Sequence, residues 1–312
     1  MIVTLVPNPS LDKTVVIPGF AKGRIHRTGE MLVLAGGKGC NFARALHTLG
    51  QRSKIIAPIG GYAGQYLLEL AAREGLECEG PSVSTELRTC LTIIDPESAD
   101  EPTEVYEQGA PLEPGTWEEL TALVGRYLEE ATFLAVCGSF PPGISQEDFA
   151  ALLHRANAAG RLVLLDTYGP QLLASLQLGP ALLKINQCEA AEMTGCEITD
   201  PAGALAAAAN LQKRGAQQVV ITLGKQGAVG LTAAGEAFGW RAPVVASVYP
   251  TGSGDSFFAG VASGLAQGQR LPEAVRLGIA VGAANTLQMG AGCLELQQVE
   301  ELLPQVQELT FD

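Results

Sequence analysis

The chain alternates short runs of apolar, often β-branched residues with longer amphipathic segments that are rich in Ala and Leu. The short runs predict buried strands and the longer segments predict helices, because a strand buried on both faces reads as nearly continuous apolar sequence. The predicted strands cover residues 2–6, 53–57, 133–137, 162–166, 182–185 and 219–223. The predicted helices cover residues 41–49, 62–74, 117–131, 146–159, 202–214, 255–267 and 271–287.

This alternation predicts an α/β fold with a mostly parallel sheet covered by helices on both faces. Two segments break the rhythm, because residues 12–35 and 88–107 each read as a pair of short strands joined by a turn. We expect them to form a small β-sheet lid, which could also serve as an oligomer interface. No segment reads as a linker, so residues 1–312 are expected to form a single α/β domain that carries this lid.

Composition narrows the class of protein. With 312 residues, 47% hydrophobic and 17% charged, the chain is typical of a soluble globular enzyme. The formal net charge of -13 argues against a nucleic-acid partner. Seven scattered cysteines without a C-x-x-C pair favour reduced thiols over disulfides or structural zinc. The sequence shows neither a signal peptide nor an apolar run of about 18 residues, so we expect a cytoplasmic protein without a membrane partner.

The strongest local signal is PTGSGDSFFAG (residues 250–260), which leads into an amphipathic helix. Gly252, Ser253 and Gly254 would leave consecutive backbone N–H groups free at the positive end of the helix dipole, where an oxyanion or a transferring phosphoryl group can bind. Asp255 could accept a hydroxyl proton while these N–H groups hold the developing charge. Taken alone, the segment is equally compatible with a helix cap that follows a glycine turn.

A second glycine-rich element, AGGKGCN (residues 35–41), also leads into a helix. Gly37 lets the backbone approach a polar ligand closely, Lys38 supplies a cation, and Asn41 offers both a donor and an acceptor. The alternative is a plain strand-to-helix turn with a surface lysine. Neither element matches the P-loop pattern, and no G-x-G-x-x-G follows the first strand.

Together the two elements resemble the signatures of the ribokinase/phosphofructokinase-B family of carbohydrate kinases, and the resemblance covers essentially the whole chain. The signatures are GGKGCNFARALHTLG (36–50) and TGSGDSFFAG (251–260). PNPSLD (7–12), GSFPPG (138–143) and Arg88 are similar to the branch of 1-phosphofructokinases, tagatose-6-phosphate kinases and the minor 6-phosphofructokinase. The resemblance implies a three-layer ribokinase-like fold and phosphoryl transfer from ATP, with Mg²⁺, to a hydroxyl of a ketohexose phosphate.

The resemblance also implies roles for individual residues on the sugar side. Asp255 is the expected catalytic base, and the amides of Gly252, Ser253 and Gly254 are the expected anion hole. The sugar hydroxyls are expected to bind Asp12, Gly37 and Asn41, and the substrate's own phosphate to bind Lys38, Arg88 and Ser139, with Arg27 as a further candidate. A converged cationic clamp of this kind would let an acidic protein bind a phosphate. Taken alone, Arg27 is typical of a surface cation.

On the nucleotide side, KINQCE (184–189) matches the family element K-x-N-x-x-E, with Ile185 where the family usually has Pro. The residues expected to bind ATP are Lys184, Asn186, Thr222, Gly224, Gly227 and Asn285, and those expected to hold Mg²⁺, through water, are Glu189 and Asn186. Without the resemblance, residues 282–292 read equally well as a packed helix and a glycine turn. Asp166 follows a buried strand, so it either faces the cleft or caps a helix.

Other functions stay open at this stage. The chain could phosphorylate an unphosphorylated sugar or a nucleoside, or it could be a catalytically silent nucleotide- or sugar-binding regulator. The intact TGSGD argues against the silent regulator, and a purely structural protein has no need of two glycine-rich anion loops. The expected partners are a small sugar phosphate and a second copy of the chain, because exposed lid strands favour a homodimer.

Overall fold

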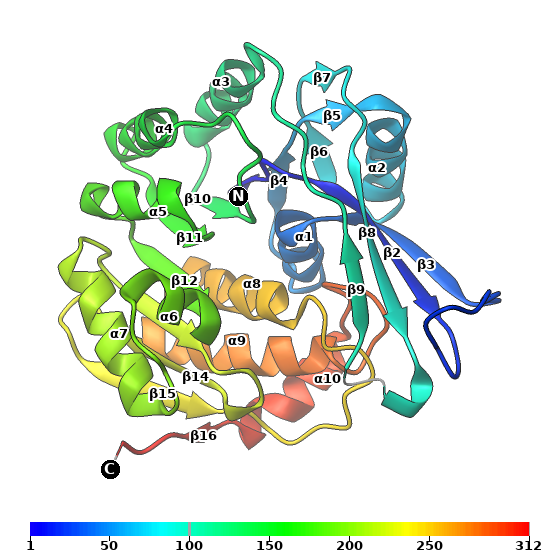
Figure 1. Cartoon of the computed structure of the whole chain (residues 1–312). Helices are drawn as coiled ribbons and strands as arrows, with labels where there is room; N and C mark the ends of the chain where they lie inside the picture. The colour runs from blue at the N-terminus through cyan, green and yellow to red at the C-terminus, as the bar shows by residue number, and fades with distance from the viewer. Residues whose placement is uncertain (99–100, 312) are drawn as a thin grey trace.

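A ten-stranded sheet lies at the centre of the computed structural model, which describes residues 1–98 and 101–311 (Figure 1). Across this sheet the strands follow in the order β16 (Gln307–Glu308), β15 (Ala237–Arg241), β14 (Ala228–Leu231), β13 (Val219–Thr222), β12 (Leu182–Asn186), β11 (Leu162–Asp166), β10 (Phe133–Cys137), β1 (Ile2–Leu5), β4 (Ser53–Ile56) and β6 (Glu77–Glu79). Neighbouring strands pair in parallel from β13 to β6, whereas β14, β15 and β16 add an antiparallel edge.

All six predicted strands are present, each within one residue of its expected bounds. The mostly parallel sheet is therefore confirmed. The sequence did not predict the antiparallel edge or β6, and these strands are two to five residues long. β14 and β15 also contain Gly230 and Gly239, which lack side chains that would mark a strand.

Helices cover both faces of the sheet, as predicted (Figure 1). One face is covered by α3 (Thr116–Leu128), α4 (Gln146–Ala158), α5 (Pro170–Ser175), α6 (Gln187–Thr194) and α7 (Pro201–Lys213). The other is covered by α1 (Lys38–Thr48), α8 (Ser253–Ala266), α9 (Leu271–Asn285) and α10 (Leu296–Leu302), while α2 (Gly61–Arg73) packs beside β4. Short 3₁₀ turns are η1 (Pro96–Ser98), η2 (Leu176–Leu178), η3 (Gly224–Gln226) and η4 (Leu303–Gln305).

Alternating residues of β1 join the two cores. Val3 and Leu5 pack with α3, and Ile2 packs with α1 on the opposite face, as expected for a strand that is buried on both sides. The seven predicted helices are all present. The first of them begins at Lys38, three residues earlier than expected, so Lys38 belongs to the first turn of α1. The shorter α5, α6 and α10 were not predicted.

The small sheet expected from residues 12–35 and 88–107 is also present. Its strand order is β3 (Met31–Gly36), β2 (Ser10–Val16), β8 (Arg88–Ile94) and β9 (Thr103–Tyr106). β2 pairs antiparallel with β3 and parallel with β8, so the two separate segments form one sheet (Figure 1). β5 (Ile59–Gly60) and β7 (Ser82–Val83) form a further two-stranded pair.

The parallel strands β1, β10, β11, β12 and β13 all end at the same edge of the central sheet. Several residues that were singled out from the sequence, among them Asp166, Lys184 and Asn186, lie at this edge, as is common for ligand sites in open α/β sheets. Among the described residues, no helix has the length and apolar character needed to cross a bilayer. All seven cysteines, each in a described position, are free thiols.

Candidate active site

Charged side chains from four elements meet where the parallel strands end. Lys38 of α1 places its Nζ 3.1 Å from Oδ1 of Asp166, at the end of β11, and 3.3 Å from Oε1 of Glu189 in α6. Lys184 of β12 lies 2.9 Å from the other carboxylate oxygen, Oδ2 of Asp166. Asp166 is 1% exposed and Lys184 is 3% exposed. Asp166 therefore joins two lysines inside the site, and this answers the alternative that it caps a helix.

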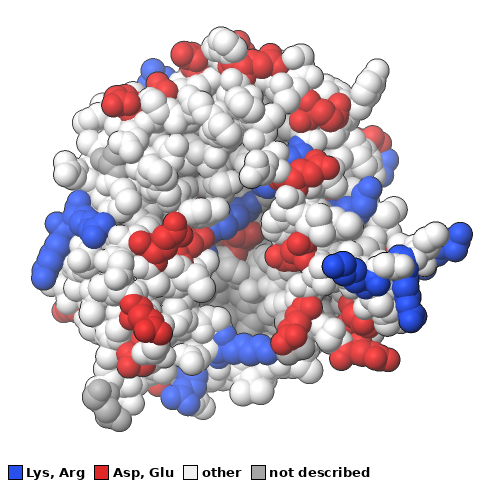
Figure 2. Space-filling view, viewed as in Figure 1, with Lys and Arg blue, Asp and Glu red and all other residues white. Residues whose placement is uncertain are grey.

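The pairing determines the charge state of this cluster. Burial pushes the pKa of Asp166 up, but Lys184 and Lys38 outweigh burial and bring that pKa below its ordinary value. Burial likewise pushes the pKa of Lys38 down, and the charges of Asp166, Glu189 and Asp255 raise it above its ordinary value. Asp166 and Lys38 therefore stay ionised, since buried charges persist when they are paired. Figure 2 shows a hollow in the face seen in Figure 1, with acidic and basic side chains around it.

Asp255 lies in the first turn of α8 and is 7% exposed. Asn41 Nδ2 donates a hydrogen bond of 2.8 Å to its Oδ2. Burial and then repulsion from Asp166 raise the pKa of Asp255 to about 7, although Lys38, Lys184 and the Asn41 hydrogen bond act in the opposite direction. A carboxyl group with this pKa can exchange a proton at neutral pH, which a general base requires.

The loop before Asp255 requires glycine. Gly252 is the N-cap of α8 with a left-handed φ of 82°. A Cβ atom at Gly252 would lie 2.5 Å from Cβ of Ala291 and 3.0 Å from the backbone nitrogen of Gly292. A larger residue would therefore collide with the loop that follows α9.

The predicted row of three free amides is only partly correct. The Ser253 N–H donates to the Pro250 carbonyl at 3.2 Å, so it closes the turn instead of remaining open. Within the described residues, the N–H groups of Gly252 and Gly254 have no hydrogen-bond acceptor. These two amides stand beside Asp255 at the start of α8, where the helix dipole favours an anion.

Asn285 was predicted to bind the nucleotide, but its side chain bonds to other residues of the protein. Its side chain is fully buried at the end of α9. Its Oδ1 accepts hydrogen bonds from Ser256 Oγ at 2.8 Å and from the Gly292 N–H at 2.7 Å. Its Nδ2 donates to the Thr251 carbonyl at 3.1 Å. Asn285 thus holds the loops on either side of Gly252, and its side chain is already bound within the protein.

The first glycine turn carries the predicted sugar-side residues. Asp12 of β2 accepts a hydrogen bond from the Gly37 N–H at 3.3 Å, and a Cβ atom at Gly36 would lie 2.1 Å from its Cγ. Gly37, with φ 90°, is the N-cap of α1, which then presents Lys38 and Asn41. The structure therefore brings Asp12, Gly37, Lys38 and Asn41 together, and through Asn41 it links them to Asp255.

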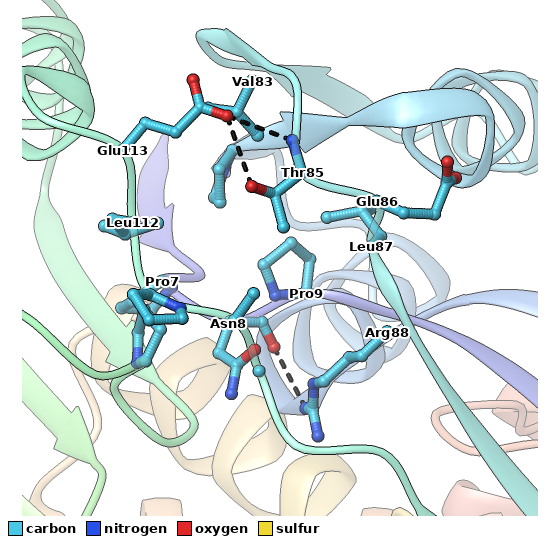
Figure 3. A pocket seen from close by; sticks show the side chains of 15 residues that line it. Pro7, Asn8, Pro9, Val83, Thr85, Glu86, Leu87, Arg88, Leu112 and Glu113 are labelled. Atoms are coloured by element: carbon cyan, nitrogen blue, oxygen red, sulfur yellow. Dashed lines mark hydrogen bonds between the residues drawn. The ribbon is translucent and has the colours of Figure 1, made fainter.

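Arg88 and Asn8 line a neighbouring cavity of about 40 Å³ (Figure 3), and Ser139 is hydrogen-bonded to Asn8. Arg88 points toward Asn8, and its Nη2 donates to the Asn8 carbonyl at 3.1 Å. Asn8 Nδ2 in turn donates to Ser139 Oγ at 3.1 Å. Among the described residues, the buried Nε of Arg88 has no hydrogen-bond partner, so one N–H donor of the guanidinium is unsatisfied. Asn8 connects the two predicted clamp residues, although no role was predicted for Asn8 itself.

Of two residues predicted for the phosphate clamp, Ser139 lies near the charged cluster and Arg27 does not. Gly138, next to Ser139, lies against Lys38, because a Cβ atom there would be 3.7 Å from the Lys38 Cβ. Ser139 is thus close to the charged cluster. Arg27 is exposed in the loop between β2 and β3, and within the described residues no hydrogen bond or ion pair joins it to Lys38, Arg88 or Ser139. The structure does not bring Arg27 to this site.

The predicted nucleotide residues line the next two strand ends. Asn186 and Glu189 form a capping box at the start of α6: the Glu189 N–H donates to Asn186 Oδ1, and the Asn186 N–H donates to Glu189 Oε2, both at 2.9 Å. Thr222 is the strand partner of Asn186. It is followed by a turn in which Gly224 (φ 57°) and Gly227 (φ 109°) have left-handed backbones. Lys184, Asn186 and Thr222 therefore share one edge.

The donor atoms limit how a metal could bind. Within the described residues, no group of three or more His, Cys, Asp or Glu side chains is arranged to hold a metal ion. Asp166 and Glu189 already pair with lysines. Mg²⁺ retains several waters and often needs only one or two protein carboxylates alongside substrate phosphates. The residues present fit an ion of that kind, with Glu189 and Asn186 beside it.

Comparison with known proteins gives consistent matches. The model for the pfkB family carbohydrate kinase matches residues 9–297. The 1-phosphofructokinase of Bacillus subtilis (strain 168) is 30% identical, over 98% of this chain and 98% of that protein. The ATP-dependent 6-phosphofructokinase isozyme 2 of Escherichia coli (strain K12) is 32% identical, over 93% of each. A structure of phosphofructokinase-2 from Escherichia coli in complex with substrates and products matches with a TM-score of 0.88 and 30% identity, covering 97% of this chain and 98% of that one.

Proposed function

The chain belongs to the pfkB family of carbohydrate kinases, and from this premise we propose that it transfers the γ-phosphoryl group of ATP to a hydroxyl of a ketohexose phosphate, giving a bisphosphate. The observation that carries the proposal is the buried Asp255 carboxylate, which follows two open amides at the start of α8 and interacts electrostatically with Lys38 and Lys184. This arrangement provides a base together with positive charge on one side of a cleft.

Asp255 accepts the proton of the attacking sugar hydroxyl while the hydroxyl oxygen bonds to the γ-phosphorus of ATP. The bond between the γ-phosphorus and the β–γ bridging oxygen breaks in line with this attack, and ADP leaves. The amides of Gly252 and Gly254 and the ammonium group of Lys184 stabilise the negative charge on the transferring group. Mg²⁺, bound mainly by phosphates and water beside Glu189 and Asn186, would neutralise further charge on the nucleotide. Thr222 and the turn at Gly224–Gln226 would border the nucleotide.

The acceptor is proposed to be phosphorylated because cations converge on the sugar side. Asp12, Gly37 and Asn41 would bind the sugar hydroxyls, while Lys38, Arg88 and Ser139 would bind its phosphate. Within the described part of the chain the buried Arg88 Nε has no partner, and a guanidinium that turned toward a phosphate could hold it with two parallel hydrogen bonds. The similar proteins named as 1-phosphofructokinase and 6-phosphofructokinase support a ketohexose phosphate of this class.

The small sheet is proposed to act both as a lid and as a contact between two copies of the chain. Glu104 of β9 accepts a hydrogen bond of 2.9 Å from Thr251 Oγ1, so the sheet already reaches the glycine loop of α8. Closure would exclude water, which otherwise competes as the acceptor. Met31 and Val105, on the sheet's outer strands, are each 57% exposed, and a second copy would cover such apolar side chains.

A coupled ADP-release assay tests the proposal with ATP, Mg²⁺ and a panel of acceptors. The panel contains fructose 1-phosphate, fructose 6-phosphate, tagatose 6-phosphate, unphosphorylated fructose, ribose and adenosine. We expect ADP release with at least one ketohexose phosphate and a much lower kcat/KM with every unphosphorylated acceptor. Faster reaction with fructose, ribose or adenosine would replace the proposal with a different kinase. Nucleotide binding without ADP release from any acceptor would indicate a silent regulator.

A further inference from the structure

Arg44 is a cation inside the packed face of α1, between the buried residues Ala43 and Ala45. It is only 6% exposed, although an apolar residue would be the ordinary occupant of such a position. Its guanidinium donates to Glu74 through Nε and Nη2, to the Ala35 carbonyl at 2.7 Å, to the Ala291 carbonyl at 2.7 Å and to Asn41 Oδ1 at 3.2 Å. One side chain thus joins α1, the end of α2, β3 and the loop after α9.

The first consequence concerns the amide of Asn41. Because Oδ1 accepts from Arg44, the Nδ2 of the same amide faces Asp255 and donates to its carboxylate at 2.8 Å. A flipped amide would turn its two N–H donors toward the guanidinium, which has only donors to offer. Arg44 therefore selects the orientation in which Asn41 serves Asp255.

The second consequence concerns the loop behind the glycine turn. Ala291, whose carbonyl accepts from Arg44, packs against Gly252 so closely that a Cβ atom on Gly252 would lie 2.5 Å from the Ala291 Cβ. Gly292 is equally close to α1, since a Cβ atom there would lie 2.4 Å from the Asn41 carbonyl oxygen. The guanidinium thus ties together two surfaces that border Asp255.

Burying this charge is costly unless it is paired. Burial lowers the pKa of Arg44, and the hydrogen bonds and charge of Glu74 outweigh this effect and raise it. The other titratable groups facing Arg44 are Cys293 and Cys40, so Glu74 is its carboxylate partner. The titratable or hydrogen-bonding groups that face Asp255 include Asp166, Lys38, Lys184, Asn41 and the buried thiol of Cys137.

We propose that Arg44 is a positioning residue for phosphoryl transfer: it holds the Asn41 amide and the Ala291 loop in place, so that the Asp255 carboxylate points into the cleft as an oriented base. This inference rests on the proposed function, because it assigns Arg44 a part in that reaction. Glu74 completes the device by neutralising the guanidinium and holding two of its nitrogens.

The test compares the pH dependence of kcat/KM in Arg44→Lys and Arg44→Met with that of the wild type. Lysine keeps the charge but, with one ammonium group, cannot reproduce the planar fork that reaches four partners. We expect kcat to fall by about 10²-fold, because small misplacements of reacting groups have effects of that size. The acidic limb of the profile should move to higher pH, since Asp255 loses an ordered donor. Arg44→Lys remains decisive if Arg44→Met does not fold.

Arg52→Met is the matched control. It breaks an exposed arginine–glutamate pair, in which Nε of Arg52 lies 2.8 Å from Glu77 with both side chains largely in water. We expect its kinetics and pH profile to equal those of the wild type. A double variant of Arg44→Lys with Asn41→Ala should show the same pH limb as Asn41→Ala alone, because Arg44 acts through that amide. If the two substitutions instead shift the acidic limb of the pH profile independently and additively, Arg44 does not act through the Asn41 amide.

An Arg44→Lys protein with a lowered Tm but an unchanged kcat and pH profile would overturn the proposal and leave Arg44 a purely structural role. A measurement that needs no catalytic turnover distinguishes a failure of the Arg44 proposal from a failure of the proposed kinase function. The carboxyl carbon of Asp255 can be titrated by NMR in wild type and Arg44→Lys. We expect the variant to titrate at higher pH whether or not a sugar substrate is found, and identical titrations would overturn the proposal.

Discussion

The two sides of the cleft are built differently. On the side of the central sheet, Asp166, Lys184 and Asp255 are each less than 8% exposed and are bonded to other side chains of the same cluster. On the side of the small sheet, every residue of β9 is exposed. Arg88 donates to two backbone carbonyls, and its Nε has no partner among the residues that the structure describes. The side chains on the central sheet are therefore already held by hydrogen bonds and ion pairs, whereas those on the small sheet are more exposed and less fully bonded.

This difference separates two tasks. Groups that must act on the reacting atoms benefit from being fixed in advance, because no reorganisation is then needed during the reaction. Groups that recognise a substrate and enclose it have to move, so they belong to the less stable part of a structure. We therefore expect substitutions near Asp255 to change turnover or stability, and substitutions near Arg88 to change substrate affinity.

The largest effect is expected for Asp255→Asn. The amide keeps the shape of the side chain but cannot accept the hydroxyl proton, so kcat should fall by about 10³- to 10⁴-fold. ATP binding, measured by isothermal titration calorimetry, should stay nearly unchanged because the two lysines and the open amides remain. A turnover within tenfold of the wild type would remove Asp255 from the role of base.

Asp166→Asn should act mainly on stability. The neutral amide leaves the buried Lys184 and the partly buried Lys38 without their shared carboxylate, and breaking a buried ion pair costs about 3–5 kcal/mol. Urea unfolding measures this loss, and Glu77→Gln in the exposed pair with Arg52 is the control, expected to cost less than about 1 kcal/mol. Equal losses in both variants would mean that the two ion pairs do not differ as their burial suggests.

Arg88→Ala should separate binding from chemistry. The lost charged hydrogen bonds to the substrate phosphate are expected to raise KM for the sugar phosphate by about 10- to 100-fold, with kcat changed only a few-fold. Initial rates across a series of acceptor concentrations give both constants. If KM is unchanged for every sugar phosphate, the phosphate clamp assigned to Arg88 is wrong.

The smallest effect is expected for Glu104→Gln. The bond from Thr251 to Glu104 is exposed to water and a glutamine oxygen can still accept it, so loss of the charge should change kcat/KM by less than about threefold. The same kinetic assay measures it. A loss of a hundredfold or more would show that the small sheet is as firmly coupled to the reaction as the central sheet, and the contrast between the two sides would disappear.

Much of this molecule could be predicted from its sequence. Buried parallel strands such as Leu162–Asp166 are continuous apolar runs, and the two glycine motifs mark both helix starts at the cleft. The short antiparallel strands at the edge of the sheet were not predicted, because they are too short to show a clear pattern of hydrophobic and polar residues. Arg44 escaped as well, although a charge between the apolar positions Ala43 and Ala45 on a helix is a visible signal. Asn285 and Ser253 were assigned to ligands, whereas their hydrogen bonds within the protein are long-range or local turn contacts that only coordinates reveal.

The most direct test of the account is the pH dependence of kcat/KM in the wild-type enzyme with its preferred sugar phosphate. A base must be deprotonated to act, and burial raises the pKa of Asp255 to about 7. The rate constant should therefore rise about tenfold per pH unit below 7 and level off above it. A profile that stays flat from pH 5 to 8 would contradict the assignment of a buried, proton-accepting carboxylate at the start of α8.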